Sequence, residues 1–185
     1  DRPSLETLLM TVIPPKYSRL NKYEQKGNIA AISSLKGSVI QIELTSNKIL
    51  ESAFLNIDGT LLEMSSAFNK ASGEFVLMDE GEFTINLVDK RGITNRDPIP
   101  YSLETLPDHK PSLTIFEPNP LSELGDDQII PINIKIMDDY GFHDLQLAYE
   151  IRKPAYLQND PYVAMFSIND ISLDSISQNI QFIWE

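Results

Sequence analysis

The stretch Gly81-Glu82-Phe83-Thr84-Ile85-Asn86-Leu87-Val88-Asp89-Lys90-Arg91-Gly92 alternates apolar and polar residues and then reaches a charged segment that ends in glycine. A period of two predicts a half-buried β-strand followed by a turn. A second apolar run ends at Leu106, and the proline-flanked segment Leu106 to Pro111 precedes a fresh strand. The region from Gly81 to Pro118 therefore predicts the end of one β-domain and the start of another.

The same strand pattern continues on both sides of this region. Gly37 to Leu44 alternates cleanly, and Asp58-Gly59 predicts a hairpin turn because glycine tolerates positive φ. Further strands are predicted at 4–12, 52–57, 61–64, 75–78, 82–88, 99–106, 112–116, 129–137, 145–151, 162–168 and 179–184. The best helical candidate, Ile171 to Ser177, is short enough to be a single turn.

A length of 185 residues suits two domains of roughly 80 to 110 residues each. We predict an all-β chain of two tandem immunoglobulin-like β-sandwiches, at residues 1–106 and 107–185. The prolines at the start of the strand at 99–106 favour an edge position for it. The join from Leu106 to Pro111 is expected to allow the domains a limited range of angles.

The second sandwich shows only about five strands where a complete one has about seven. We therefore expect it to be incomplete at its C-terminal side and to lack its last hairpin. A sandwich short of two strands exposes backbone donors and acceptors along an edge. Pairing with another chain, including an edge-strand dimer, is the expected consequence.

The charge of the chain limits the kinds of partner that it can bind. With 15 basic and 27 acidic residues the net charge is -12, which disfavours nucleic acid and anionic membrane surfaces. Residues 1–106 carry 11 basic and 14 acidic groups, whereas residues 107–185 carry 4 and 13. The absence of cysteine removes thiol catalysis, zinc-thiolate sites and disulfides together. No apolar run reaches the roughly 18 residues that a membrane helix needs, so direct membrane contact is not expected.

Motifs for catalysis are weak. His109 and His143 lie beside Asp108 and Asp144, which could make a general base or a metal ligand, but a linker histidine and a turn histidine are the simpler interpretation. No nucleophile elbow or His-Glu-x-x-His run is present. We predict that the chain is not an enzyme and has no cofactor.

Two groups of residues are candidate binding sites. Acidic turns supply the calcium candidates Asp108, Asp138 and Asp139, although aspartate is also an ordinary turn residue. The loop from residue 16 to 26 supplies the partner-binding candidates Lys16, Tyr17, Arg19, Lys22 and Tyr23. It could dock an acidic partner or a sugar, or it could simply cover a sheet edge. Trp184, the only tryptophan, is predicted to lie in a core.

Several segments together resemble a family of uncharacterised bacterial membrane-anchored proteins with extracytoplasmic immunoglobulin-like modules. They are Ile13-Pro14-Pro15-Lys16-Tyr17-Ser18-Arg19-Leu20, Lys36-Gly37-Ser38-Val39, Gly81-Glu82-Phe83 with Asp89-Lys90-Arg91-Gly92, Asp108-His109-Lys110-Pro111, and Asp138-Asp139-Tyr140-Gly141-Phe142 with Leu145-Gln146-Leu147-Ala148-Tyr149. Ser18-Arg19 departs from the Thr-Gly that is more frequent in the family.

The resemblance implies a non-enzymatic structural or protein-interaction module of a larger cell-envelope protein. It implies a periplasmic or cell-surface location and a membrane-anchored parent, and it supplies no catalytic residue. The alternative is a carbohydrate- or calcium-binding extracellular module.

Overall fold

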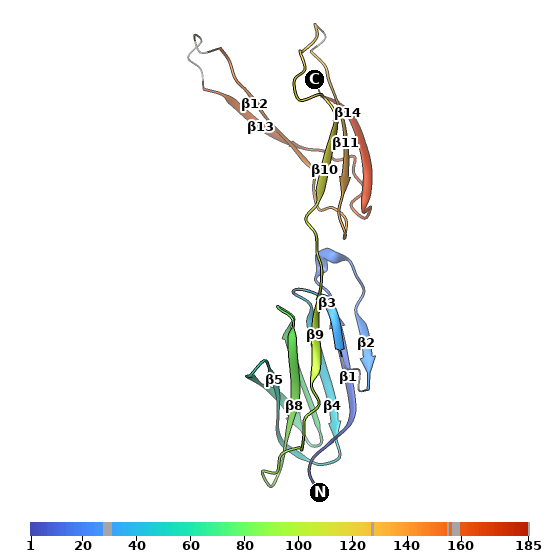
Figure 1. Ribbon diagram of the computed structural model, residues 1–185, viewed down its shortest axis with the longest axis vertical. Coiled ribbons are helices and arrows are strands. Elements are labelled where there is room, and N and C mark those ends of the chain that lie inside the picture. The colour runs from blue at the N-terminus through green and yellow to red at the C-terminus, as the bar shows by residue number, and fades with distance from the viewer. Residues whose placement is uncertain (28–30, 127, 155, 157–159, 185) are drawn as a thin grey trace. The chain divides into compact units, whose positions relative to one another are not determined.

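The chain is all-β. The computed structural model describes residues 1–27, 31–126, 128–154, 156 and 160–184. Its strands and a short 3-10 helix fall into two compact units, Asp1–Asp108 and His109–Glu185, called unit 1 and unit 2 below (Figure 1). The boundary between the units lies two residues after the predicted division at 106/107. In the described part of the chain, no helix is long and apolar enough to cross a membrane.

Unit 1 is a β-sandwich made from one continuous series of strands. Its elements are β1 (Leu5–Ile13), the 3-10 helix η1 (Lys16–Ser18), β2 (Tyr23–Lys26), β3 (Ala31–Leu35), β4 (Val39–Ser46), β5 (Leu50–Ile57), β6 (Thr60–Ala67), β7 (Lys70–Val76), β8 (Gly81–Asp89) and β9 (Tyr101–Leu106). Hydrogen bonding joins them in the order β2, β1, β4, β7, β6, β5, β8, β9, β3.

Strand β6 turns this series into two layers. Its first part, Thr60 to Met64, pairs with β5, and its last part, Ser65 to Ala67, pairs with β7. One layer therefore contains β2, β1, β4 and β7, and the other contains β5, β8, β9 and β3. The apolar core of unit 1 draws residues from both layers.

Alternation along each strand fills that core. In β4, Ile40, Ile42 and Leu44 are buried while Gln41 and Glu43 are exposed, as the period of two predicts. The same alternation in β8 buries its apolar residues against the opposite layer.

The ring of Phe83 in β8 is fully buried at the centre of an aromatic cluster. Its centroid lies 5.0 Å from that of Tyr101 in a stacked arrangement and 5.5 Å from that of Phe75, which comes from the other layer. This cluster ties both layers together in the region where the sequence first indicated a strand.

The strand β9 occupies an interior position, so the predicted edge position for residues 99–106 is wrong. It lies between β8 and β3, and it pairs with β3 in parallel. The reason is that Pro98 and Pro100 precede the strand, which begins at Tyr101, so their missing N–H groups interrupt no ladder bond.

Strands β2 and β3 are the two ends of the hydrogen-bonded series, and a tyrosine connects them. The Tyr23 hydroxyl in β2 donates to the Ser33 carbonyl oxygen in β3 at 2.7 Å. Burial raises the pKa of the Tyr23 phenol, and its ring packs against the core of unit 1. The two layers are thus linked at this edge by a side chain and at the other by β6.

Unit 2 contains five strands among its described residues. They are β10 (Ser112–Glu117), β11 (Ile130–Met137), β12 (Gln146–Ile151), β13 (Tyr162–Ser167) and β14 (Ser177–Trp184). The strands β10, β11 and β14 form one antiparallel sheet, and β12 and β13 form a separate antiparallel hairpin that runs obliquely to it in Figure 1.

The two units share a connectivity. The pairings β1 with β4 and β4 with β7 in unit 1 correspond in order and direction to β10 with β11 and β11 with β14 in unit 2. Likewise the hairpin of β5 and β6 corresponds to that of β12 and β13. The prediction of an all-β chain with immunoglobulin-like sandwich architecture is confirmed by this topology.

Several elements differ from the sequence prediction. The strands β2 and β3 were not predicted, because each is short and neither has a long alternating apolar pattern. The strand β7 begins at Lys70, five residues before the predicted start at residue 75. The loop predicted from residue 16 to 26 contains η1 and all of β2, and residues 28–30 lie outside the described part of the chain.

Candidate functional site

The first candidate, the segment from Lys16 to Tyr23, begins as a tightly bonded turn. The Ser18 hydroxyl donates to the Pro15 carbonyl oxygen at 2.7 Å, and Arg19 has a left-handed φ of 57°. Glycine adopts this conformation more readily than arginine does. Lys16 and Lys22 are exposed.

Two of the five predicted partner-binding residues have clear roles within unit 1. Tyr23 connects β2 to β3, as described above. The Tyr17 hydroxyl donates to the Asp108 carboxylate at 2.7 Å, which attaches η1 to the segment that follows β9, while 54% of the Tyr17 side chain stays exposed. Partner binding through this segment stays a prediction, for which Lys16, Tyr17 and Lys22 offer accessible surface and the half-buried Tyr23 offers little.

The calcium candidates are bonded to donors of the protein itself. Asp108 accepts the hydrogen bond from Tyr17. One carboxylate oxygen of Asp138 accepts the Tyr140 N–H at 3.1 Å, which is ordinary turn geometry. Asp108 belongs to unit 1, whereas Asp138 and Asp139 belong to unit 2. Among the described residues, no group of three or more acidic, histidine or cysteine side chains is arranged to hold a metal ion.

The two histidines lie in different surroundings. The Asp139 carboxylate accepts the backbone N–H of His109 at 3.0 Å and lies 2.7 Å from the ring Nδ1 of the same residue. These contacts hold the pKa of Asp139 below its usual range, the backbone hydrogen bond being the main cause. His143 is exposed, and its neighbour Asp144 accepts a hydrogen bond from the Gln146 side chain at 2.6 Å.

Asp89 is a buried carboxylate with a lowered pKa in the turn after β8. Its side chain is only 4% exposed, and one oxygen accepts the backbone N–H groups of Ile93 and Arg91, both at 2.9 Å. The pKa of Asp89 lies below its usual range, mainly because of the hydrogen bond from Ile93, and the hydrogen bond from Arg91 and the nearby Lys48 lower it further. The carboxylate therefore stabilises the turn after β8, and the Asp89-Lys90-Arg91-Gly92 motif has a structural explanation.

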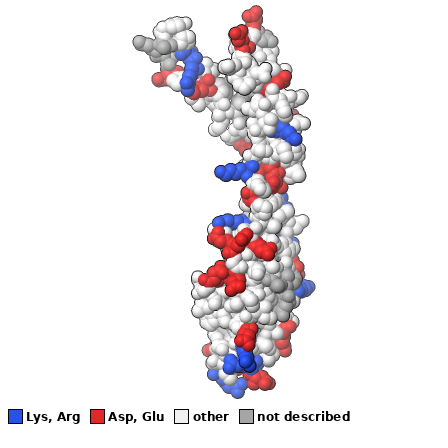
Figure 2. Space-filling model, in the orientation of Figure 1, with Lys and Arg blue, Asp and Glu red and all other residues white. Residues whose placement is uncertain are grey.

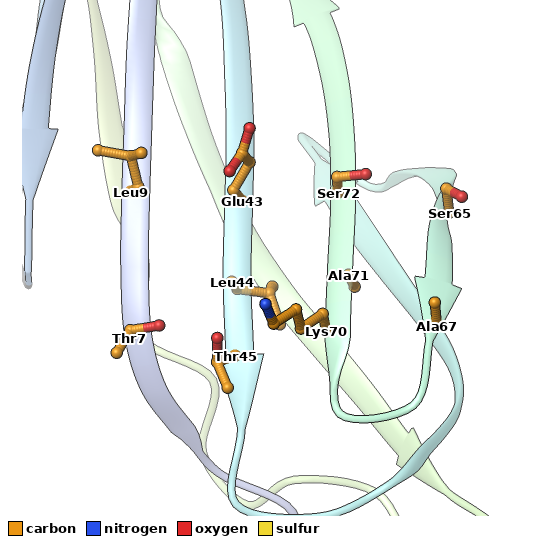
Figure 3. Close-up of a pocket in the computed structure, with 10 residues that line it drawn as sticks. All are labelled: Thr7, Leu9, Glu43, Leu44, Thr45, Ser65, Ala67, Lys70, Ala71 and Ser72. Atoms are coloured by element: carbon orange, nitrogen blue, oxygen red, sulfur yellow. The ribbon is translucent and has the colours of Figure 1, made fainter.

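Unit 1 has a polar groove on its outer surface. It has a volume of about 450 Å³ and lies over β1, β4, β7 and β6, where Figure 3 shows Lys70 extending from β7 toward β4. Hydroxyl groups and two charged side chains dominate its lining, which consists of Thr7, Leu9, Glu43, Leu44, Thr45, Ser65, Ala67, Lys70, Ala71 and Ser72. None of these residues is aromatic, so the groove has no flat apolar ring on which a sugar could stack.

Unit 2 has an apolar cleft of about 270 Å³ between its sheet and its hairpin. Its lining is mostly aliphatic and aromatic, and the side-chain amide of Gln146, the Tyr149 hydroxyl and the Trp184 indole N–H supply its polar side-chain atoms. The lining consists of Leu113, Ile115, Pro118, Ile130, Ile132, Ile134, Leu145, Gln146, Leu147, Tyr149, Ile168, Phe182 and Trp184. On the β10 side, Leu113 and Ile115 are 50% and 59% exposed. Uncharged side chains cover most of the visible face of this unit (Figure 2).

Aromatic side chains of the hairpin and the sheet meet at this cleft. The ring centroids of Tyr149 in β12 and Trp184 in β14 are 4.6 Å apart, and desolvation raises the pKa of the Tyr149 phenol. Trp184, which was predicted to lie in a core, is partly buried and packs against the apolar cluster of unit 2. This cleft was not predicted. The signal in the sequence that could have indicated it is the run of alternating isoleucines from Ile130 to Ile136, whose apolar face needs more covering surface than five strands supply.

Comparison with known proteins shows a distant structural likeness. No protein family model matches the chain, and no curated protein matches it. Among solved structures, the chain is similar to fibronectin(III)-like modules of CbhA from Clostridium thermocellum, with 12% sequence identity and a TM-score of 0.30, over 82% of this chain and 86% of that one. The strand topology described above establishes the fold. The predicted family membership and membrane-anchored parent stay predictions.

Proposed function

We propose that this chain is a non-enzymatic module of a larger bacterial cell-envelope protein, on the periplasmic or cell-surface side, and that it binds a protein partner through unit 2. The apolar cleft of unit 2 carries the proposal. Leu113 and Ile115 are half exposed although they lie on the same face as the buried Ile134. A contiguous apolar surface that remains open to water marks sites of protein contact.

The ionisable groups support the non-enzymatic part of the proposal. The carboxylates with lowered pKa have local structural partners: Asp89 in its turn, Asp139 at His109, and Glu150 at Arg152. Active sites instead gather shifted groups in one concave pocket. The cell-envelope setting rests on the family resemblance of the sequence motifs.

Selection of peptides by display tests protein binding directly. A library of random peptides is selected on the full chain and depleted on the Ile115→Lys variant, which places a charge at the open side of the cleft. Because Ile115 is 59% exposed, this variant should fold normally. Peptides that bind the native chain and not the variant support a protein-binding function, and a selection that yields none contradicts it.

A carbohydrate-binding function is the second candidate. The groove of unit 1 has no aromatic ring for stacking, but its hydroxyl and charged groups could hydrogen-bond a sugar. Glu43 and Lys70 provide charged hydrogen-bonding groups beside Thr45. An array of glycans is the direct test, with Lys70→Ala as the matched variant.

Calcium binding by the acidic turns is tested by thermal unfolding. A metal that binds only the folded form must raise the unfolding midpoint. An unchanged midpoint in about 5 mM calcium contradicts the metal version, since even millimolar affinity would then stabilise the fold measurably.

A further inference from the structure

The cleft of unit 2 has a backbone edge as well as an apolar floor. Within the described residues, β12 pairs with β13 on one side and with no strand on the other. The inward side chains of β12, Leu147 and Tyr149, line the cleft next to this edge, and Leu113 and Ile115 line it from β10. An unpaired edge beside an apolar floor can accept an added strand, through backbone hydrogen bonds and alternate side chains.

In unit 1 the strand that corresponds to β12 is paired on both of its edges. There the strand β5, which corresponds to β12, has two partners: β6 on one side and β8 on the other, both antiparallel. The strand β8 places Phe83, Ile85 and Leu87 on the core with at most 2% exposure. In unit 2, Leu113 and Ile115 of β10 keep half or more of their surface exposed.

We propose that the cleft binds an extended strand of a partner polypeptide, which pairs antiparallel with the free edge of β12 and places apolar side chains in the cleft at alternate positions. This inference rests on the proposed function and specifies the partner. The strand resembles β8 in its alternation. Its remaining positions are basic, because unit 2 has 4 basic and 12 acidic residues from His109 onward.

A second copy of this chain fits the cleft poorly. The chain has a net charge of -12, so two copies repel each other. The hairpin of a second copy already packs against its own sheet, through Tyr149 with Trp184 and Phe166 with Phe182. It would have to leave that sheet before it could cover another. A separate basic strand meets neither obstacle.

The probe is a peptide that copies β8 with its two acidic residues replaced by lysine, Gly-Lys-Phe-Thr-Ile-Asn-Leu-Val-Lys. Its binding is followed by the fluorescence of Trp184, the only tryptophan of the chain, which lines the cleft. We expect a saturable shift of the emission to shorter wavelength. A peptide of the same composition with the apolar residues placed together should give no saturable signal, because alternation is lost.

Two variants of β10 locate the binding site. Ile115→Lys faces the cleft, whereas Phe116→Lys changes the adjacent residue, which is 54% exposed and is not part of the lining. The first should weaken peptide binding by about tenfold or more, and the second by less than about twofold, since only the first puts a charge in the apolar contact. Equal weakening by both variants would overturn the assignment to the cleft.

N-methylation of the peptide tests strand pairing. Methyl groups on the amides of alternate residues block one edge of the strand, and methyl groups on the other set block the opposite edge. One set should abolish binding and the other should preserve it. Equal binding of both methylated peptides would refute the pairing with β12. The pairing would also be refuted if no binding were detected up to about 1 mM, both for the probe and for versions with Val, Ile, Leu or Phe at the inward positions. A dissociation constant of about 1 mM corresponds to a binding free energy of only about 4 kcal/mol, which a specific strand contact should exceed.

The outcomes also separate this inference from the proposed function. If display yields peptides that depend on Ile115 but bind as helices, the chain binds protein and the strand proposal is wrong. If display yields no such peptides, the protein-binding function is contradicted as well.

Discussion

Replacement of the central aromatic residue of unit 1 tests both its core and its independence from unit 2. We predict that Phe83→Ala destabilises unit 1 by about 4 kcal/mol. The ring is fully buried between Phe75 and Tyr101. About 150 Å² of ring surface at about 25 cal/mol per Å² gives this value, and large-to-alanine substitutions at aromatic core positions fall in the range of about 3 to 5 kcal/mol.

The assay is urea unfolding followed by two signals. Far-UV circular dichroism reports the strands of both units, whereas the fluorescence of Trp184 reports unit 2 alone, because it is the only tryptophan. We expect Phe83→Ala to move the transition of unit 1 to lower urea concentration and to leave the Trp184 transition in place. The matched control is Phe68→Ala, which removes a ring that is 81% exposed and should change stability by less than about 0.5 kcal/mol.

Two results would refute this reasoning. A loss of less than about 1 kcal/mol in Phe83→Ala would mean that the aromatic cluster contributes far less than its burial indicates. A shift of the Trp184 transition by the same amount as the circular dichroism transition would mean that the two units unfold as one.

Three further predictions concern single contacts. Tyr23→Phe removes the bond to Ser33 and should destabilise unit 1 by about 0.5 to 1.5 kcal/mol in the same urea assay; an unchanged midpoint would contradict the proposed closure by this side chain. Gly81→Ala should destabilise unit 1 because the new Cβ would collide with the Asp58 carboxylate. The loss of stability should be smaller when Asp58 is also replaced by alanine, and equal losses with and without Asp58→Ala would show that the collision is unimportant. The folded-state pKa of Asp139 is lowered, so its carboxylate stabilises unit 2 at pH values above about 4, and this contribution should be lost as the pH falls through the lowered pKa. The urea midpoint of the Trp184 transition should therefore fall less steeply at acidic pH in Asp139→Asn than in the native chain. The same steepness in both proteins would contradict this prediction.

The sequence predicted those features that depend on local pattern. Alternation in β4 and β8 and the Asp58-Gly59 turn appear in the structure as expected, with φ values of 46° and 89° at the turn. A period of two fixes which face a residue takes, so buried and exposed positions of long strands can be read directly. The class of fold follows from the number and spacing of such strands.

The features that escaped prediction depend on distant partners. The strand β3 exists because it pairs in parallel with β9, about seventy residues later, and its short sequence carries no sign of that pairing. The interior position of β9 depends on the same contact. The cleft of unit 2 depends on how far the hairpin of β12 and β13 covers the sheet, and no local pattern records that distance. Partner binding by Lys16 and its neighbours, and calcium binding by the aspartates, stay predictions.

The parallel pairing of β3 with β9 also bears on how unit 1 responds to mechanical tension. Its N-terminus and the end of β9 lie at opposite ends of the unit in Figure 1, so tension applied between them pulls β9 lengthwise. The hydrogen bonds of β9 to β3 along Ser102 to Leu106, and to β8 along Tyr101 to Leu103, would then be loaded together in shear and would not open one after another. Forced unfolding is governed by the rate of such a rupture, and a shear geometry makes that rate low. We therefore expect unit 1 to keep its length under load.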